Sequence, residues 1–550
     1  MTQYFVNRLK SLGLKDCMLN LGRNWYIPLS AAFFLLSNLG LPAFNNSPVN
    51  SYYSFIPAMI LIVLASSVSS PFSSVLSKTS FKVMAISLID SFGICYCTWD
   101  ALKNYPFIWG GDTMFYRRIF MVLAVPFVFV ICILFWNKLE KVISNLLAQA
   151  KVKRIEWLIY LFIFCLICAF ITLCFLNSTA FHGEDYNVDI IYTSDSHKLL
   201  KNNAFIVFDH IENDFRQPLF AVFSAPFAGI PCLIGSLIPG VPMALPLAYV
   251  QAAMILFSVF VLSYELKLNS VQRICFFLLS SATYTILVFS VVIEQYATAF
   301  FYLILTIHLI RENKKDAVLS SYGASGSLLV SGAFVPFVFY PEKGGSSNII
   351  RWIKEMALYA LDFCLLIVMA GRFHVLWNSV QMLKHLSKFS GESVSFSGRI
   401  LQYVNFIGGC FFAPDSCPVM VDRGYYGWQL AEVITVNVIG MVVFALAIAG
   451  FFVTRKSFIS KISIFWICMS FLVLVIVGWG ISENGLFLYS LYFGWPFIVL
   501  IFGLVKYIEE KLKTKLIIPL FSIALTILML VFNIPVIIEM LVFAIFAFPV

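Results

Sequence analysis

The chain has 550 residues, of which 61% are hydrophobic and only 12% charged, and Phe alone contributes 57. Average soluble domains carry about twice that charged share, so the composition excludes a soluble multidomain protein and indicates a polytopic membrane protein. The net charge of +9 does not indicate nucleic-acid binding, because the basic residues lie in short clusters between apolar runs instead of forming one contiguous basic face.

The N-terminal 25 residues are polar and lack the apolar region and cleavage site of a signal peptide. The first membrane helix is therefore expected to act as the insertion signal. A helix needs about 20 apolar residues to cross the hydrocarbon core. On that criterion the sequence predicts thirteen spans, at 27–43, 55–70, 83–99, 119–136, 157–176, 242–265, 274–292, 296–310, 357–371, 429–453, 462–480, 486–505 and 516–533.

Two further apolar stretches do not have the form of a simple span. The run 326–340 is short and contains Gly and Pro, so we expect a re-entrant segment that enters and leaves on the same side. The final stretch, 534–550, is either a fourteenth span or an interfacial helix. The predicted fold class is thus all-α and polytopic, with a four-span N-terminal module (1–155) followed by a membrane core (156–550).

The distribution of Lys and Arg predicts the orientation in the cell membrane. With a cytoplasmic N-terminus, 26 of the 37 basic residues fall in segments on the inside, as the positive-inside rule requires. This topology leaves two long loops outside, 177–241 and 372–428. The second loop contains Cys410 and Cys417, which form a disulfide or remain two thiols. No Cys and His spacing resembles a zinc site.

The first outer loop is rich in acidic residues. Seven of the 28 Asp and Glu residues lie between 177 and 217. A solvated loop collects charges without any function, but the longer loop 372–428 holds only three acids. Enrichment in one loop, directly after a membrane span, fits a catalytic or ligand-binding loop better.

Two segments of that loop carry the candidate chemistry. In YTSDSHKLLKNNAF, Asp195 lies between two serines and precedes residues that can form a short helix, so the alternative to a catalytic role is that Asp195 caps this helix. In ENDFRQPLFAVFSAPFAG, a polar cluster leads into an aromatic run that contains Pro218 and Pro226. This pattern favours a juxtamembrane helix over 218–230 that lies in the membrane interface and does not cross it.

A span, an outer loop with an isolated acid (Asp195 in TSDS) and a juxtamembrane helix (RQPLFAVFSAPF) together resemble the GT-C class of polytopic glycosyltransferases. The stretches VVIEQYATAFFYLIL and ENGLFLYSLYFGWPF and the broken segment 326–340 are also similar to that class. The resemblance covers about 157–505. It differs in that about four spans precede the acidic loop, whereas the loop of that class usually follows the first span.

The resemblance implies transfer of a sugar from a polyprenyl-phosphate donor to a hydroxyl of a saccharide or lipid-linked acceptor at the outer membrane face. Such transfer needs a carboxylate base near the acceptor hydroxyl and cations on the phosphate leaving group. Asp195 is the first candidate for the base and Asp185 the second. Substrate contacts are expected from Arg216, Arg372, Lys201, Asp214, Gln217 and Glu294. The alternative role of Arg216 and Arg372 is to anchor span ends at the interface.

No cofactor is expected, and many enzymes of this class are thought to need no metal; the alternative is a divalent cation held by His197 with Asp195 and Asp189. A lipid-linked saccharide polymerase or ligase is the second reading within the enzyme class. The alternative hypothesis outside the enzymes is a polysaccharide flippase or transporter. Asp90 and Asp362 fall inside predicted spans, and proton relays in transporters use such carboxylates. Both have polar neighbours in the sequence, which weakens that reading. A non-enzymatic scaffold would account for neither the acidic loop nor the re-entrant segment.

Overall fold

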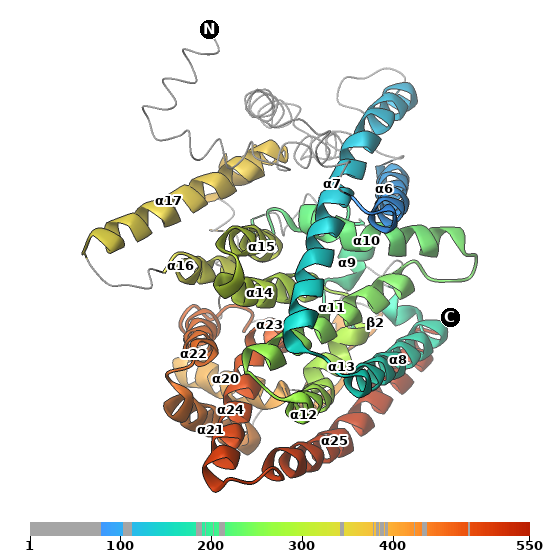
Figure 1. The fold of residues 1–550 in the computed structure, drawn as a ribbon. Coiled ribbons are helices and arrows are strands. Elements are labelled where there is room, and N and C mark those ends of the chain that lie inside the picture. Colours follow the sequence, from blue (N-terminus) through green and yellow to red (C-terminus); the bar gives the residue numbers. More distant parts are fainter. Residues whose placement is uncertain are drawn as a thin grey trace. The chain divides into compact units, whose positions relative to one another are not determined.

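The computed structural model describes residues 79–102, 113–182, 190–192, 194–201, 203–207, 215–340, 346–377, 379–380, 384, 390, 394–422, 424–431, 437–481 and 485–550. The described chain is mostly helical, with one two-stranded hairpin (Figure 1). Within it, six helices are long and apolar enough to cross a membrane, or up to eight if each of two bent pairs counts as one span. The predicted spans 27–43 and 55–70 lie outside the described residues.

The longer helices are α6 (Phe81–Leu102), α7 (Thr113–Ala150), α8 (Arg154–Asn177), α10 (Phe220–Leu237), α11 (Ala244–Glu265), α12 (Ser270–Ser281), α14 (Gln295–Glu312), α15 (Lys314–Ser327), α17 (Ser346–Met369), α20 (Phe396–Gly409), α21 (Val438–Thr454), α22 (Phe458–Phe471), α24 (Trp495–Leu512) and α25 (Ile517–Ala547). The shorter ones are η2 (Thr179–Phe181), α9 (Ser196–Lys201), α13 (Tyr284–Val291), η3 (Leu329–Phe334), α16 (Val335–Val338), α18 (Phe373–Trp377), η5 (Leu472–Ile476), η6 (Gly485–Tyr489) and α23 (Ser490–Phe493). Strands β1 (Ser416–Asp422) and β2 (Tyr425–Leu430) pair antiparallel.

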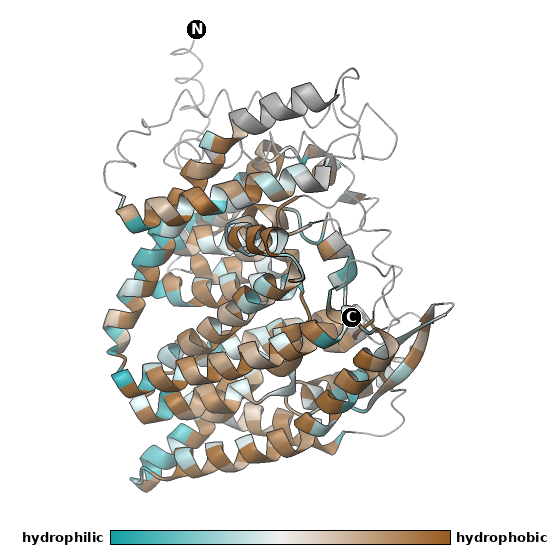
Figure 2. Ribbon diagram, turned by 90° about the vertical axis from the view of Figure 1, so that its right-hand side faces the viewer, coloured by the Kyte–Doolittle hydropathy of each residue, from teal (hydrophilic) through white to brown (hydrophobic). Residues whose placement is uncertain are grey.

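Large apolar side chains on several of these helices face outward. On α8, Leu161, Phe162 and Leu166 are each more than half exposed, and α25 exposes Leu520 and Val531 in the same way. Figure 2 shows helices that are mostly brown, with teal residues gathered near their ends. Apolar exposure on this scale is what a lipid-facing surface requires, since soluble monomers rarely expose large apolar patches. The chain is therefore a multi-pass membrane protein.

The chain forms two compact units. Unit 1 comprises residues up to 147, 202–238 and 321–382, and unit 2 comprises 148–201, 239–320 and 383–550. Each unit is described by itself below.

In unit 2, charged side chains join several helix ends at what we call the basic end. Arg273 near the start of α12 donates to both carboxylate oxygens of Glu156 near the start of α8, at 2.9 and 3.0 Å. Lys506 of α24 donates to the carbonyl of Leu266, at the end of α11. Glu509 accepts from Gln272 of α12 and from the backbone N–H of Ile518 in α25.

The opposite helix ends of unit 2 meet at what we call the loop end. The end of α8 contacts the end of α25, because Ser178 donates to the carbonyls of Ala544 and Phe548 (Figure 1). α25 is one helix of 31 residues with Pro535 inside it. The sequence prediction that divides this region into a span at 516–533 and a separate segment at 534–550 is therefore wrong. A proline does not end a helix when neighbouring groups satisfy the freed carbonyl.

Two crossings of unit 2 are bent. α12 and α13 meet at 65°, and η6 with α23 meets α24 at 47°. α12 starts beside Glu156 at the basic end, and α13 leads to Glu294 beside Asp195 at the loop end. Each bent pair thus connects the two ends as a single broken span would, which agrees with the spans predicted at 274–292 and 486–505.

The segment predicted as the outer loop 372–428 contains a well-packed helix. α20 begins near the loop end, where Arg399 contacts the carbonyl of Ile476, and its last turn reaches the break between α12 and α13. The chain then returns to the loop end, where Ser416 is hydrogen-bonded to Tyr192. The predicted span 429–453 is too long at its start, because 425–430 form β2. Cys410 and Cys417 are both free thiols.

In unit 1, α6 and α10 cross at two glycines. A Cβ on Gly93 would lie 2.1 Å from the carbonyl oxygen of Gly229, so no larger residue fits this close approach. Asp90 is fully buried beside the crossing and accepts a hydrogen bond from Trp136 at 3.0 Å. Its neighbour in sequence, Ser91, instead donates to the carbonyl of Leu88, so the partners of Asp90 come from α7 and from the backbone of α10.

α10 differs from the predicted juxtamembrane helix over 218–230. It is continuous over Phe220–Leu237 with Pro226 and Pro231 inside, and its length and composition are those of a membrane span. The predicted end near residue 230 is therefore wrong. The segment 326–340 is irregular as predicted, with α15, η3 and α16 in succession. Backbone hydrogen bonds from Leu219 to Gly326 and from Leu329 to Arg216 hold it. Its re-entrant course stays a prediction.

Candidate functional site

Asp195 lies at the start of a short helix in unit 2, as the sequence predicts. The carbonyl of Asp195 accepts from the N–H of Leu199, so Asp195 occupies the N-cap position of α9. Asp195 is half-buried, whereas Ser194 and His197 on either side are buried. The loop at this point is thus packed against the membrane helices, although the capping role of Asp195 remains an alternative to catalysis.

Glu294 fixes the position of Asp195. Its carboxylate accepts the backbone N–H of Asp195 at 2.5 Å, and Ser196 donates to the carbonyl of Ile293 at 2.8 Å. Glu294 is fully buried at the N-cap position of α14, where the positive end of the helix dipole favours a carboxylate. Its own N–H donates to Gln251 of α11 at 3.0 Å. The backbone of the predicted base is therefore attached to the start of α14 and, through Glu294 and Gln251, to the candidate membrane span α11.

The two loops that the sequence predicts to lie outside join beside this site. The N–H of Trp428 in β2 donates to the carbonyl of Ile190, and the N–H of Tyr192 donates to the carbonyl of Trp428. The Tyr192 hydroxyl is hydrogen-bonded to Tyr284 and Ser416, and the indole of Trp428 donates to it at 3.1 Å. Burial raises the pKa of the Tyr192 phenol above its ordinary value, so the phenol stays protonated at physiological pH.

Aromatic side chains bring the two stretches VVIEQYATAFFYLIL and ENGLFLYSLYFGWPF together. Tyr296 stacks on Tyr492 at 5.3 Å between ring centroids and meets Tyr489 edge to face. Gln295 is fully buried, and within the described part of the chain neither its amide nitrogen nor its amide oxygen has a hydrogen-bond partner. The stretch from Glu294 to Tyr296 is therefore a polar insertion in the core of unit 2.

Two of the three predicted phosphate contacts, Arg216 and Arg372, belong to unit 1, whereas Lys201 belongs to unit 2. Arg372 follows the end of α17 and is only 2% exposed, and its alternative role as an anchor at the membrane interface stays a prediction. Arg216 is half-buried and Gln217 buried, both beside the irregular segment that follows α15. The hypothesis from the sequence that Asp195, Arg216 and Arg372 converge on one cavity at the outer leaflet stays a prediction.

For three predicted site residues the structure describes the backbone alone or nothing. Asp185 and Asp214 lie outside the described residues, and Lys201 is described only as the last backbone position of α9. Among the described residues, no group of three or more His, Cys, Asp and Glu side chains could hold a metal ion. Asp189 of the imagined metal site is also outside the described residues.

Sequence reasoning missed the amides that hold the site. Gln251 donates from its side chain to the carbonyls of Phe289 and Val292 at 2.6 and 2.7 Å, at the end of α13. Asn533 does the same at the α12–α13 break, donating to the carbonyls of Ala282 and Phe411. The available signal was a single amide side chain within an apolar run, because a buried amide needs hydrogen-bond partners.

The arrangement can hold one carboxylate, Asp195, at a fixed place on the loop end of a membrane domain, supported by a second, buried carboxylate. Two cavities described within unit 2 lie elsewhere, since neither Asp195 nor Glu294 lines them. Comparisons of the chain with protein-family models, with curated proteins and with solved structures found no match.

Proposed function

We propose that the chain is an integral-membrane glycosyltransferase that moves a sugar from a polyprenyl-phosphate donor to a hydroxyl of a cell-envelope glycan or lipid acceptor. The observation that carries the proposal is the attachment of Asp195 to Glu294. A general base works only if it is held within hydrogen-bond reach of the proton that it removes. The hydrogen bonds from Asp195 and Ser196 to the start of α14 supply that rigidity.

The membrane setting supports the same reaction. A polyprenyl chain stays in the bilayer, since burying each CH₂ group is worth about 0.8 kcal/mol. An enzyme that uses such a donor must therefore act at a membrane surface. The Asp195 segment lies at the loop end of unit 2, where the membrane helices α8, α13 and α25 end. Arg216 and Arg372 are the proposed contacts to the donor phosphate, because the guanidinium group pairs with phosphate oxygens in a bidentate way.

The test is transfer by the purified chain in liposomes that contain radiolabelled polyprenyl-phosphate hexose or pentose, with envelope glycan as acceptor. The proposal predicts label in the glycan and release of polyprenyl phosphate. Label that stays on the lipid with every donor would contradict it. A polymerase or ligase would instead transfer a preassembled oligosaccharide from a polyprenyl-diphosphate carrier, which the same assay detects.

A flippase or transporter for a lipid-linked saccharide is the second candidate, and the bent spans favour it. Transporters commonly use discontinuous helices at their binding sites. A cavity of about 430 Å³ also lies at the basic end, lined by Arg273, Arg311, Glu265 and Glu312 among others. Movement of a fluorescent polyprenyl-phosphate sugar across the liposome bilayer, without transfer of the sugar, would support this candidate over the enzyme.

A further inference from the structure

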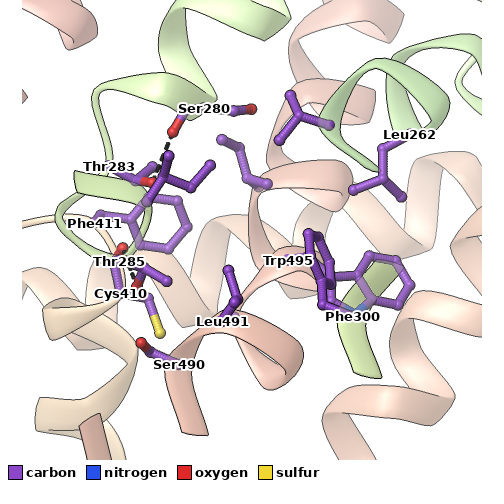
Figure 3. A pocket seen from close by; sticks show the side chains of 14 residues that line it. Leu262, Ser280, Thr283, Thr285, Phe300, Cys410, Phe411, Ser490, Leu491 and Trp495 are labelled. Atoms are coloured by element: carbon purple, nitrogen blue, oxygen red, sulfur yellow. Dashed lines mark hydrogen bonds between the residues drawn. The ribbon is translucent and has the colours of Figure 1, made fainter. Parts of the chain in front are cut away.

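A small, partly open cavity of unit 2 lies beside three irregular segments. It has a volume of about 40 Å³ and is lined from the α12–α13 break, from the α23–α24 break and from the turn that follows α20 (Figure 3). Figure 3 shows Ser280 and Thr283 on one side, Cys410 and Ser490 below them, and Trp495 with Phe300 on the opposite side. The cavity thus lies between these irregular segments and the regular helices α11 and α14, which contribute Val259, Leu262 and Phe300.

Three buried polar atoms of the lining have no hydrogen-bond partner within the described chain. They are the hydroxyl oxygens of Ser280 and Ser490 and the indole nitrogen of Trp495. These residues are 3%, 1% and 5% exposed. Buried polar groups in native proteins are nearly always hydrogen-bonded, to protein or to ordered water. Three such atoms around one cavity therefore indicate a ligand that supplies the missing hydrogen bonds.

The chemistry of the lining selects a neutral ligand. The indole of Trp495 can only donate, which opposes a cation. The hydroxyls of Thr283 and Thr285 donate to the carbonyls of Ser280 and Cys410, so toward a ligand they can only accept. None of the residues that line the cavity is charged, so an ion would lose its hydration without a counter-charge. The ligand must both donate and accept hydrogen bonds.

The volume decides the size of the ligand. One water molecule needs about 10–15 Å³ of cavity volume. A cavity of about 40 Å³ therefore holds about three water molecules and is too small for a sugar. We propose that the cavity is a binding site for a cluster of water molecules that completes the hydrogen bonding of two broken membrane helices. Irregular backbone at membrane depth is tolerated where it is buried in protein or lines a hydrated cavity. This proposal does not depend on the glycosyltransferase proposal.

The test is hydroxyl-radical footprinting by X-ray radiolysis of the full chain in lipid nanodiscs, with oxygen-18 water as the probe and mass spectrometry as the readout. Radicals form at bound water, so side chains next to it are oxidised even when they are buried. Trp495 should be oxidised several-fold faster than Trp466. Trp466 is the matched control because it is fully buried, does not line the cavity, and donates its indole N–H to the carbonyl of Tyr492.

Equal, slow oxidation of the two tryptophans would show a dry cavity and overturn the proposal. Ser490→Ala should slow oxidation of Trp495 and leave Trp466 unchanged. Ser470→Ala is the control, since Ser470 is buried but bonded to Ile467 and does not line the cavity. Fast oxidation of Trp495 that Ser490→Ala leaves unchanged would place the water elsewhere. If the oxidation rate of Trp495 changes when sodium in the buffer is replaced by potassium, the ligand is an ion and the proposal is overturned.

Discussion

At the scale of single residues, Asn533 is the side chain on which most local structure depends. It is fully buried in α25, donates to the carbonyls of Ala282 and Phe411, and accepts the N–H of Ala413 at 2.7 Å. Asn533→Leu keeps the size but removes a hydrogen bond from the carbonyl of Ala282 and from the N–H of Ala413, whereas the carbonyl of Phe411 keeps the N–H of Tyr284. Since each buried group left without a partner costs about 1–3 kcal/mol, we expect Tm in detergent to fall by several degrees.

The neighbouring Ile534 is 44% exposed and supplies the control for this prediction. Ile534→Leu should leave Tm within error of the parent, because the side chain stays apolar and faces outward. A Tm for Asn533→Leu equal to that of the control would show that the break between α12 and α13 is held by other contacts.

The candidate residues could be predicted only in part. Asp195 and its helix were predicted because a polar residue followed by a helical pattern is a local signal. Glu294 could be singled out, yet its bond to Asp195 could not, because the two residues are 99 positions apart. The hydrogen-bond group of Tyr192, Tyr284 and Trp428 went unpredicted for the same reason, since aromatic residues are common throughout this sequence.

At the scale of elements, the Glu156–Arg273 ion pair links α8 to α12 inside unit 2. Both side chains are buried, and the pair is bidentate. Glu156→Gln leaves the guanidinium buried without a counter-charge, which typically costs about 3–5 kcal/mol. The pair Arg351–Glu355, in which Arg351 is exposed and Glu355 half-buried, is the comparison, where Glu355→Gln should cost at most about 1 kcal/mol. Similar Tm losses for the two variants would contradict this account of the basic end.

Close packing of α21 against α24 depends on Gly450. A Cβ at this position would lie 2.1 Å from the carbonyl oxygen of Leu500, so Gly450→Val must push the helices apart. Overpacking of this kind typically costs about 1–3 kcal/mol. Ala445→Val on the exposed side of α21 is the control. Size-exclusion chromatography after heating gives the midpoint of thermal unfolding for each variant. The same midpoint for both would show that Gly450 and Leu500 do not form this close contact.

Helices that consist of one long apolar run were predicted well from the sequence. The predicted 157–176 and 242–265 correspond to α8 and α11. The amphipathic helix α20 does not register as a span, because it has only 14 residues and packs against other helices. The predicted span 429–453 overlaps only the last two residues of β2, since the apolar run that marks the span begins near this strand end. The continuity of α25 through Pro535 depends on tertiary contacts that a sequence pattern does not contain.

At the scale of the whole molecule, the two ends of unit 2 differ in a way that predicts orientation. Lys267, Arg273, Arg311 and Lys506 gather at the basic end, which the positive-inside rule assigns to the cytoplasm. In a cysteine-free background, Met420→Cys in the hairpin should react with an impermeant maleimide on intact cells. Lys515→Cys should react only after permeabilisation. The reverse pattern would put the proposed site on the wrong face and refute the topology.

The measurement that tests the central claim most directly is sugar transfer by Asp195→Asn. Asn caps a helix about as well as Asp and keeps the N–H that bonds to Glu294, but it is a far weaker base. If Asp195 is the base, transfer from a labelled polyprenyl-phosphate sugar should fall by about 10²–10⁴-fold, while Tm and expression stay unchanged. If the variant transfers sugar at nearly the parental rate, Asp195 is a helix cap and the proposed mechanism is contradicted.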